Sequence, residues 1–557
     1  SSLAGERLVE SPEHYVDPAT PYTFKPRSLS AVLDGLKIYQ RPAETPGAIP
    51  AELFGEVVSS TAFGYARIDA LLSKIDRSKI PCSGYGMHRH VSSPAVTIPE
   101  VEDRRCAIWE YQTNPNLQKA VRSIIGNLAA KKSSLLTGYQ EAVRGFRATG
   151  LADHRKKNLF QAIGEKLRHV GRVSPHIGIA RKTVLRTLEG IATLPETESE
   201  YWNDIRIRAN EVLEHPDATL LRDKVYAVWG GVKTREEVGI GTLGIGVNFG
   251  AIDRLQVANV LLCALIPGSM GFMTWLTSFQ LVNFIRDRSA ANFTSRNEQS
   301  ENRFFFDLVS ELETLDSLSR ASTDLQKRGW KFPSLIESEK YFFSAKNLRS
   351  PTLSWSGSGE VVGNDIEIGG GKALAITGPN SGGKTTLANS LFQAQLLAQL
   401  GLPIPVDAAT ISVADRLRYQ GPVFAGLESE GRFGEELQAV KDTFMELTPK
   451  SLVVFDEIVG GTSAKEQLQI AEDIIGGCVE LGSGTVVITH DLELANVLSE
   501  KQLATPLTLL LDTQGEPTFR VIEGVSKSSE AIRVAKKIGF TGEDIRRIVA
   551  EKKRADH

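Results

Sequence analysis

With 557 residues the sequence is too long for a single hydrophobic core, so we expect roughly two to four domains. Hydrophobic residues make up 41% and charged residues 24% of the chain, which excludes a largely disordered protein, and a formal net charge of −3 excludes a uniformly basic nucleic-acid coat. The four cysteines form no CxxC pair and the N-terminal residues contain acids and prolines but no apolar run, so neither a zinc site, a disulfide framework nor a secretion signal is predicted.

The first part of the chain divides into two regions. Residues 1–95 are rich in proline and glycine, which interrupt any long periodic pattern, and we expect an irregular N-terminal region there. From residue 96 to 345 the pattern is helical, because apolar residues such as Leu117, Val121, Ile124 and Leu128 repeat at spacings of three and four. This predicts a largely α-helical domain over residues 96–345.

A basic segment lies inside the helical domain. Residues 131–186 carry 13 Lys or Arg residues against three acids, a net charge of +10. Two interpretations remain open: the segment contacts nucleic-acid phosphates, or it forms a solvated helix face.

A long uncharged run follows at residues 255–285. Its length would span a bilayer, which makes a membrane anchor one interpretation. Pro267, Gly268 and Ser269 divide the run in the middle, and polar residues are scattered through it. We therefore favour two buried helices joined by a tight turn.

The character of the chain changes again over residues 346–520. Short apolar runs at 373–377, 452–455 and 485–489 alternate with helical segments at 385–400 and 467–481. This alternation predicts an α/β domain whose mostly parallel sheet is covered by helices. Residues 507–511 and 519–522 predict a closing hairpin, and residues 521–557 include a C-terminal helical segment.

One motif points directly to a phosphate ligand: Gly378-Pro379-Asn380-Ser381-Gly382-Gly383-Lys384-Thr385, which follows an apolar run and opens a helix at Thr386. The glycines let backbone N–H groups converge on phosphate oxygens, and the helix N-terminus adds a favourable dipole. We expect Lys384 to reach the β- and γ-phosphates and the Thr385 hydroxyl to bind Mg²⁺. Residues 378–386 are thus the predicted nucleotide contacts.

Polar residues end two further apolar runs. Asp456 and Glu457 follow residues 452–455, and His490 follows residues 485–489. Strand ends of a parallel sheet meet at one edge, so we expect these side chains beside the phosphate loop. Asp456 would hold Mg²⁺, and Glu457 would deprotonate the attacking water. His490 would contact the γ-phosphate or steady that water, which makes Glu457, His490 and Lys384 the predicted catalytic residues.

The order and spacing of several short motifs resemble the ATPase domain of MutS proteins, and the likeness extends more weakly to the C-terminal segment and to the start of the helical domain. The matching residues are Asn364-Asp365, the Ile376-Thr377-Gly378-Pro379-Asn380 loop, Leu397 to Gly401 with Pro405, Asp415-Arg416, Phe455 to Ile458, Gly461-Thr462-Ser463, Gly524 to Ser526, Ala535 to Gly539, and Asp103 to Ala107 with Asn127-Leu128.

This resemblance implies an ABC-type P-loop ATPase that uses ATP and Mg²⁺ and couples hydrolysis to a dimeric clamp on duplex DNA, in mismatch repair or a related repair or recombination process. It implies a homodimer, with residues 521–557 as the dimerisation segment and the partner's signature loop completing each ATP site. The basic residues 131–186 would then contact DNA. The expected location is either the cytoplasm, in association with the nucleoid, or the nucleus.

The sequence departs from the MutS pattern in three places. In the region that corresponds to the family's signature loop, residues 428–436, Gly431 and Arg432 replace the usual Ser-Thr, so Ser429 or the Gly431 backbone would have to serve instead. Val361 stands where an aromatic residue commonly stacks on adenine. Fewer than about 100 residues precede the helical core, so we expect a short member without the mismatch-recognition domain.

A second functional hypothesis belongs to another class. An ATP-driven mechanical or scaffold protein at a membrane or a ribonucleoprotein, without mismatch recognition, would use residues 255–285 as its anchor. The homodimer could equally be a heterodimer with a paralogue.

Overall fold

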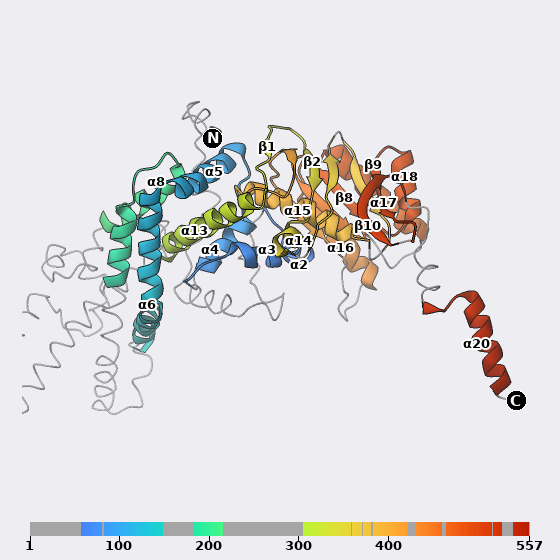
Figure 1. The fold of residues 1–557 in the computed structure, drawn as a ribbon, viewed down its shortest axis with the longest axis horizontal. Coiled ribbons are helices and arrows are strands. Elements are labelled where there is room, and N and C mark those ends of the chain that lie inside the picture. Colours follow the sequence, from blue (N-terminus) through green and yellow to red (C-terminus); the bar gives the residue numbers. More distant parts are fainter. Residues whose placement is uncertain are drawn as a thin grey trace, which may run out of the picture.

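The computed structural model describes residues 57–80, 83–148, 182–214, 305–357, 359–369, 371–379, 382–421, 431–458, 464–514, 516–525 and 538–555. In these residues a helical arm lies beside an α/β domain, and the C-terminal helix α20 (Gly542–Ala555) extends away from the sheet (Figure 1). The uncharged run 255–285 lies outside the described residues. Among the residues that are described, no helix is long and apolar enough to cross a membrane.

The α/β domain contains two sheets. The larger has six strands in the order β10-β9-β4-β8-β7-β6, all parallel to their neighbours except β10. Its strands are β4 (Ala373–Thr377), β6 (Leu417–Gln420), β7 (Leu452–Asp456), β8 (Gly484–Ile488), β9 (Ala504–Leu511) and β10 (Pro517–Glu523). The smaller sheet has the order β1-β5-β2-β3, formed by Ser334–Leu335, Ala408–Ile411, Phe343–Leu348 and Asn364–Ile368.

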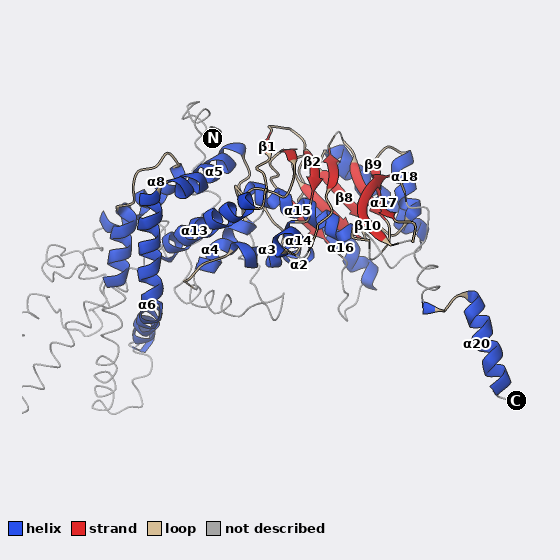
Figure 2. Ribbon diagram, in the orientation of Figure 1, coloured by secondary structure: helices blue, strands red, loops and turns tan. Residues whose placement is uncertain are grey.

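Helices cover both faces of the larger sheet (Figure 2). Leu374 and Ile376 of β4 pack in the core with α15 (Lys384–Gln399), whereas Ala373 and Ala375 pack on the opposite face with α17 (Ala464–Leu481) and α18 (Leu492–Glu500). Burial on both faces explains why the strands are continuous apolar runs without alternation. The predicted α/β domain and its closing hairpin, β9 and β10, are confirmed; the sheet is mixed because β10 is antiparallel.

The helical arm has its own core. It contains α5 (Ile98–Thr113), α6 (Pro115–Ala148), α8 (Glu200–Glu214) and α13 (Phe305–Lys327). Trp202 is fully buried, stacks on Tyr111 with ring centroids 5.7 Å apart, and donates its indole N–H to the Ala107 carbonyl at 2.9 Å. These helices agree with the helical character predicted for residues 96–345, but β1 and the start of β2 also fall in that range and belong to the smaller sheet. Of the basic segment, the structure describes the backbone of α6 to Ala148 and residues 182–186, and the remainder lies outside the described residues.

The described part of the N-terminal region is helical, in contrast to the irregular chain predicted for residues 1–95. It forms α2 (Ser60–Tyr65), α3 (Ile68–Ile75) and α4 (Ser83–Ser92). Ile68, Leu71, Leu72 and Ile75 repeat at helical spacing and are buried in the same core as the two sheets. These short helices are stabilised by tertiary packing. The prolines that flank them led to the prediction of an irregular chain.

His88, in helix α4, should make the free energy of unfolding depend on pH. Burial lowers the pKa of His88 to about 4, and its ring stacks on Phe63 at 5.9 Å. An unfolded histidine titrates near pH 6.5, so between pH 6.5 and about 4 the unfolded state binds a proton that the folded state does not. We expect His88 to contribute a loss of roughly 2 kcal/mol of stability as the pH falls from 7.5 to 5.

Urea unfolding of the wild type and of His88→Phe at both pH values checks this contribution. The variant keeps an aromatic ring against Phe63 but cannot bind a proton, so its stability should fall less over this range. All other titrating groups, including Asp103, whose pKa burial raises to about 6, are common to both proteins. Identical pH dependence in the two proteins would show that His88 is protonated equally in the folded and unfolded states.

Candidate nucleotide-binding site

Three adjacent strands of the larger sheet deliver the predicted site residues. β4 leads into the glycine-rich loop, β7 ends at Asp456, and β8 is followed by Thr489 and His490. The sheet order β4-β8-β7 is parallel throughout, so all three carboxyl ends lie at the same edge. In open α/β sheets this edge is where ligands bind.

The loop between β4 and α15 has a backbone that requires glycine. Gly378 has a φ of 131° and Gly383, the residue before α15, a φ of 99°. A Cβ at Gly382 would lie 2.9 Å from both Leu509 Cδ1 and Pro379 Cγ. These glycines bring the backbone close to the N-terminus of α15, as a phosphate-binding loop needs. Asn380 and Ser381 lie outside the described residues.

Lys384, the first residue of α15, folds back over this loop. Its side chain is buried, and its Nζ donates to the carbonyls of Gly378 at 2.8 Å and Pro379 at 3.0 Å. The same Nζ lies 3.5 Å from His490 Nδ1. The ammonium therefore lies between the loop and the end of β8, while Thr385 and Thr386 are exposed in the first turn.

The two carboxylates face different partners. The Thr385 hydroxyl donates to Asp456 Oδ2 at 3.5 Å, and Glu457 Oε1 lies 3.4 Å from His490 Nε2. Glu457 has a φ of 60°, which is unusual for a residue with a side chain, and its N–H donates to the Ile488 carbonyl at 3.1 Å. This left-handed backbone conformation directs the carboxylates of Asp456 and Glu457 to two different positions at the carboxyl edge of the sheet.

The surroundings of the Asp456 carboxylate disfavour an unpaired negative charge, so a bound cation would stabilise its ionised form. Burial and, after it, the charge of Glu457 raise the pKa of Asp456, whereas Lys384 and hydrogen bonds from Thr385 and Tyr419 lower it. The hydroxyl of Thr385 and the carboxylate of Asp456 are hard oxygen ligands, which Mg²⁺ prefers. Among the described residues, no group of three His, Cys, Asp or Glu side chains is arranged to hold a metal ion. Mg²⁺ bound by Thr385 and Asp456 would take its other ligands from water and phosphate oxygens.

The signature-loop residues are placed only in part. Ser429 lies outside the described residues, and Gly431 is the first residue of α16 (Gly431–Met445). Their predicted role in a partner's site stays a prediction.

The structure adds a residue that the sequence did not single out. Phe519 of β10 is half exposed, has a φ of 59°, and its Cδ1 would lie 3.3 Å from a Cβ at Gly383. Asn364 holds this strand, because its Nδ2 donates to the Phe519 carbonyl at 3.0 Å and its Oδ1 accepts from the Val521 N–H at 2.9 Å. A single aromatic residue in an edge strand carries no sequence signal of such proximity.

The fold and the site together define an ATPase-type α/β domain: a helix-covered, mainly parallel sheet with a glycine-rich loop, a lysine and paired carboxylates at one edge. Residues 374–554 match MutS domain V. This match and those to the proteins named below support membership of the MutS family.

Three relatives illustrate the similarity. The chain is 30% identical over 197 residues to a DNA mismatch repair protein MSH3 of Coccidioides immitis, which is 35% of this chain and 17% of that protein. It is 32% identical over 194 residues to an endonuclease MutS2 of Leuconostoc mesenteroides, covering 33% and 23%. It is 30% identical over 240 residues to a DNA mismatch repair protein MutS of Shouchella clausii, covering 42% and 27%. The matched segments thus span less than a third of these relatives.

Proposed function

We propose that the chain is an ABC-type P-loop ATPase that couples ATP binding and hydrolysis to a dimeric clamp on DNA. The observation that carries the proposal is the convergence of Lys384, Thr385, Asp456, Glu457 and His490 at one sheet edge. The proposed division is a helical arm within residues 96–345, an ATPase domain over residues 346–520 and a dimerisation segment over residues 521–557, although β1 and the start of β2 precede residue 346 and the end of β10 follows residue 520.

The loop and the start of α15 would hold the triphosphate. Backbone N–H groups around Gly382 and Gly383 and the helix dipole favour phosphate oxygens. Lys384 would exchange its bonds to the Gly378 and Pro379 carbonyls for bonds to the β- and γ-phosphates. Thr385 and Asp456 would hold Mg²⁺, which when bound neutralises charge on the phosphates.

Glu457 is the proposed general base. Its exposed carboxylate would accept a proton from the attacking water, and His490, 3.4 Å away, would orient that carboxylate and the water. Lys384 would stabilise the charge on the transferred phosphoryl group. Proton transfer to Glu457 leaves a hydroxide equivalent that would attack the γ-phosphorus, while the bond from the γ-phosphorus to the β,γ-bridging oxygen breaks and ADP leaves.

Phe519 is the proposed contact for the nucleotide base. Its half-exposed ring lies beside Gly383, and Asn364 fixes the backbone of this residue from the neighbouring sheet. Stacking on an aromatic face tolerates any base and contributes on the order of 1 kcal/mol. This assignment would compensate for Val361, which offers no ring.

A homodimer with composite sites is proposed from the C-terminal segment and the signature loop. Exposed apolar side chains lie before and along α20, namely Ile538, Phe540, Ile545 and Val549. Such a row in a charged helix suits burial against a second copy. The partner's Ser429 or the Gly431 backbone would then complete each ATP site.

DNA is the proposed macromolecular ligand, because two of the three relatives described above are named as DNA mismatch repair proteins and residues 131–186 carry a charge of +10. If six to ten of those side chains contact phosphates, affinity for duplex DNA should fall by about 10³ to 10⁵ between 50 and 200 mM salt. Fluorescence anisotropy with homoduplex, mismatched and branched DNA measures this dependence. The same DNA should stimulate ATP hydrolysis.

A triple variant, Arg155→Ala, Lys156→Ala and Lys157→Ala, tests where the charge acts. A plot of log affinity against log salt concentration has a negative slope, and the magnitude of this slope should be smaller by about three in the variant. Each lost phosphate contact removes roughly one released counterion. Alanine at Lys327, Lys372 and Lys450, which are exposed elsewhere, removes equal charge and should leave the slope unchanged. Equal effects of the two triple variants, or hydrolysis indifferent to DNA, would contradict the proposal.

A further inference from the structure

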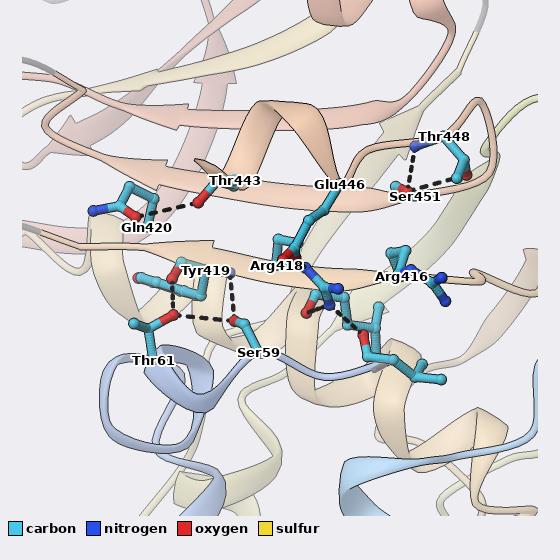
Figure 3. A network of polar contacts seen from close by, with 12 residues as sticks. Ser59, Thr61, Arg416, Arg418, Tyr419, Gln420, Thr443, Glu446, Thr448 and Ser451 are labelled. Atoms are coloured by element: carbon cyan, nitrogen blue, oxygen red, sulfur yellow. Dashed lines mark hydrogen bonds and ion pairs between the residues drawn. The ribbon is translucent and has the colours of Figure 1, made fainter. Parts of the chain in front are cut away.

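The N-terminal segment extends the larger sheet at the nucleotide-binding domain's outer strand. Val58 forms a parallel bridge with Leu417 of β6, the Ser59 N–H donates to the Leu417 carbonyl at 3.0 Å, and the Leu417 N–H donates to the Val57 carbonyl at 2.6 Å. Figure 3 shows Ser59 and Thr61 directed at β6, where Thr61 Oγ1 donates to the Tyr419 carbonyl at 2.6 Å. Residues 57–61 are therefore bonded to a strand that adjoins β7 and its Asp456.

The same segment is tied to the helix that begins at Lys384. Asn389 Nδ2 of α15 donates to the Tyr65 carbonyl at 3.0 Å, and Gln393 Nε2 donates to the Ala66 carbonyl at 2.7 Å. These amides lie one helical turn apart, on a buried face of α15. The end of α2 is thus fixed between β6 and α15, the two elements that flank the metal-binding edge.

This placement packs two tyrosines together beside Asp456. The rings of Tyr65 and Tyr419 are nearly parallel, at 8°, with centroids 5.8 Å apart. Gly421 leaves room for the first ring, since a Cβ there would lie 2.4 Å from Tyr65 Cε1. Phe392 of α15 packs edge-on against Tyr419 at 5.9 Å. The Tyr419 ring is therefore held on two sides.

The Tyr419 hydroxyl is the unusual group in this cluster. Tyr419 is 1% exposed, and its hydroxyl interacts with Asp456 only beyond normal hydrogen-bond distance, with no closer partner among the residues that the structure describes. A buried hydroxyl that lacks a full hydrogen bond destabilises the fold, so a shorter bond from Tyr419 to Asp456 would be favourable.

The charge of Asp456, at the end of the neighbouring strand β7, acts on both phenols. After burial, the charge of Asp456 is the next cause that raises the pKa of each tyrosine, and Tyr419 in turn lowers the pKa of Asp456. The other charges acting on this carboxylate are Glu457 and Lys384. A phenol O–H is a suitable donor for one oxygen of a carboxylate whose other oxygen faces Thr385.

We propose that Tyr419 is a positioning residue for Asp456, donating its hydroxyl to the carboxylate when nucleotide and Mg²⁺ are bound, and that Tyr65 holds the Tyr419 ring in place. The inference rests on the proposed function of Asp456 as a magnesium ligand. It makes the N-terminal segment, far from the ATPase motifs in sequence, part of the nucleotide site.

The test measures the Mg²⁺ concentration that half-saturates nucleotide binding, by fluorescence titration with an ATP analogue, together with kcat and KM for ATP. Tyr419→Phe removes only the hydroxyl and should raise the half-saturating Mg²⁺ concentration about ten- to a hundred-fold, the effect of losing a hydrogen bond to a charged group. Tyr65→Leu removes the stacked ring and should shift it in the same direction. Binding of the analogue in EDTA should be unchanged by Tyr419→Phe.

Two comparisons separate the possible failures. Tyr111→Phe deletes another buried hydroxyl, which donates to Asp316 at 2.5 Å in the helical arm, and should alter thermal stability without altering the Mg²⁺ requirement. Asp456→Asn should raise the Mg²⁺ requirement most. If Asp456→Asn shifts the requirement and Tyr419→Phe does not, the positioning role is wrong; if neither shifts it, the proposed metal site itself is wrong.

Discussion

Replacing Glu457 with glutamine is expected to lower the rate of ATP hydrolysis by about 10²- to 10⁴-fold, the usual contribution of a general base. Glutamine keeps the size and shape of the side chain, and the Glu457 backbone is fixed by its bond to the Ile488 carbonyl. The variant should therefore still bind ATP and Mg²⁺ with nearly the affinity of the wild type. Single-turnover phosphate release and equilibrium ATP binding separate the two properties.

Glu480→Gln is a matched control, because it removes one acid from the C-terminal end of α17, which precedes the amino end of β8 and not the carboxyl ends that form the site. Its hydrolysis rate should equal that of the wild type. Hydrolysis by Glu457→Gln at the wild-type rate would exclude Glu457 as the base. A Glu457→Gln protein that no longer binds ATP would instead assign the residue to binding.

Removing the ammonium of Lys384 is expected to weaken ATP binding by about ten- to a hundred-fold, the effect of losing charge-assisted hydrogen bonds. Lys384→Met is the suitable variant because it keeps an aliphatic side chain in a position that is only 4% exposed. The loss of bonds to the Gly378 and Pro379 carbonyls should also loosen the loop. Isothermal titration with ATP and Mg²⁺ measures the affinity.

Lys372→Met, just before β4, removes an exposed lysine from the same region and should leave ATP affinity unchanged. A circular dichroism spectrum matching the wild type shows that the Lys384 variant is folded. Undiminished ATP affinity in folded Lys384→Met would mean that the loop does not hold the triphosphate.

Much of the α/β domain was predictable because its signals are local. Strands buried on both faces read as continuous apolar runs, and a glycine-rich turn between a strand and a helix has few alternative structures. The edge at which Asp456, Glu457 and His490 meet follows from parallel strand order alone. What each side chain does with ATP stays a prediction, tested by the variants above.

The remaining features depend on contacts between distant residues. Nothing in residues 57–66 signals that they pair with β6, because the bridge from Val58 to Leu417 spans most of the chain. The stacking of Tyr65 on Tyr419 and the position of Phe519 beside Gly383 depend on the same long-range packing. The helices α2 to α4 were missed for a related reason: they are short, and tertiary burial stabilises them more than propensity does.

One nucleotide and one metal ion are proposed to occupy the edge formed by the carboxyl ends of β4, β8 and β7. Anomalous diffraction from crystals grown with Mn²⁺ and a non-hydrolysable ATP analogue tests this proposal most directly. We predict a manganese peak within coordination distance of Thr385 Oγ1 or of a water held by Asp456, with the γ-phosphate against Lys384. A manganese peak or a triphosphate bound away from these three residues would contradict the account.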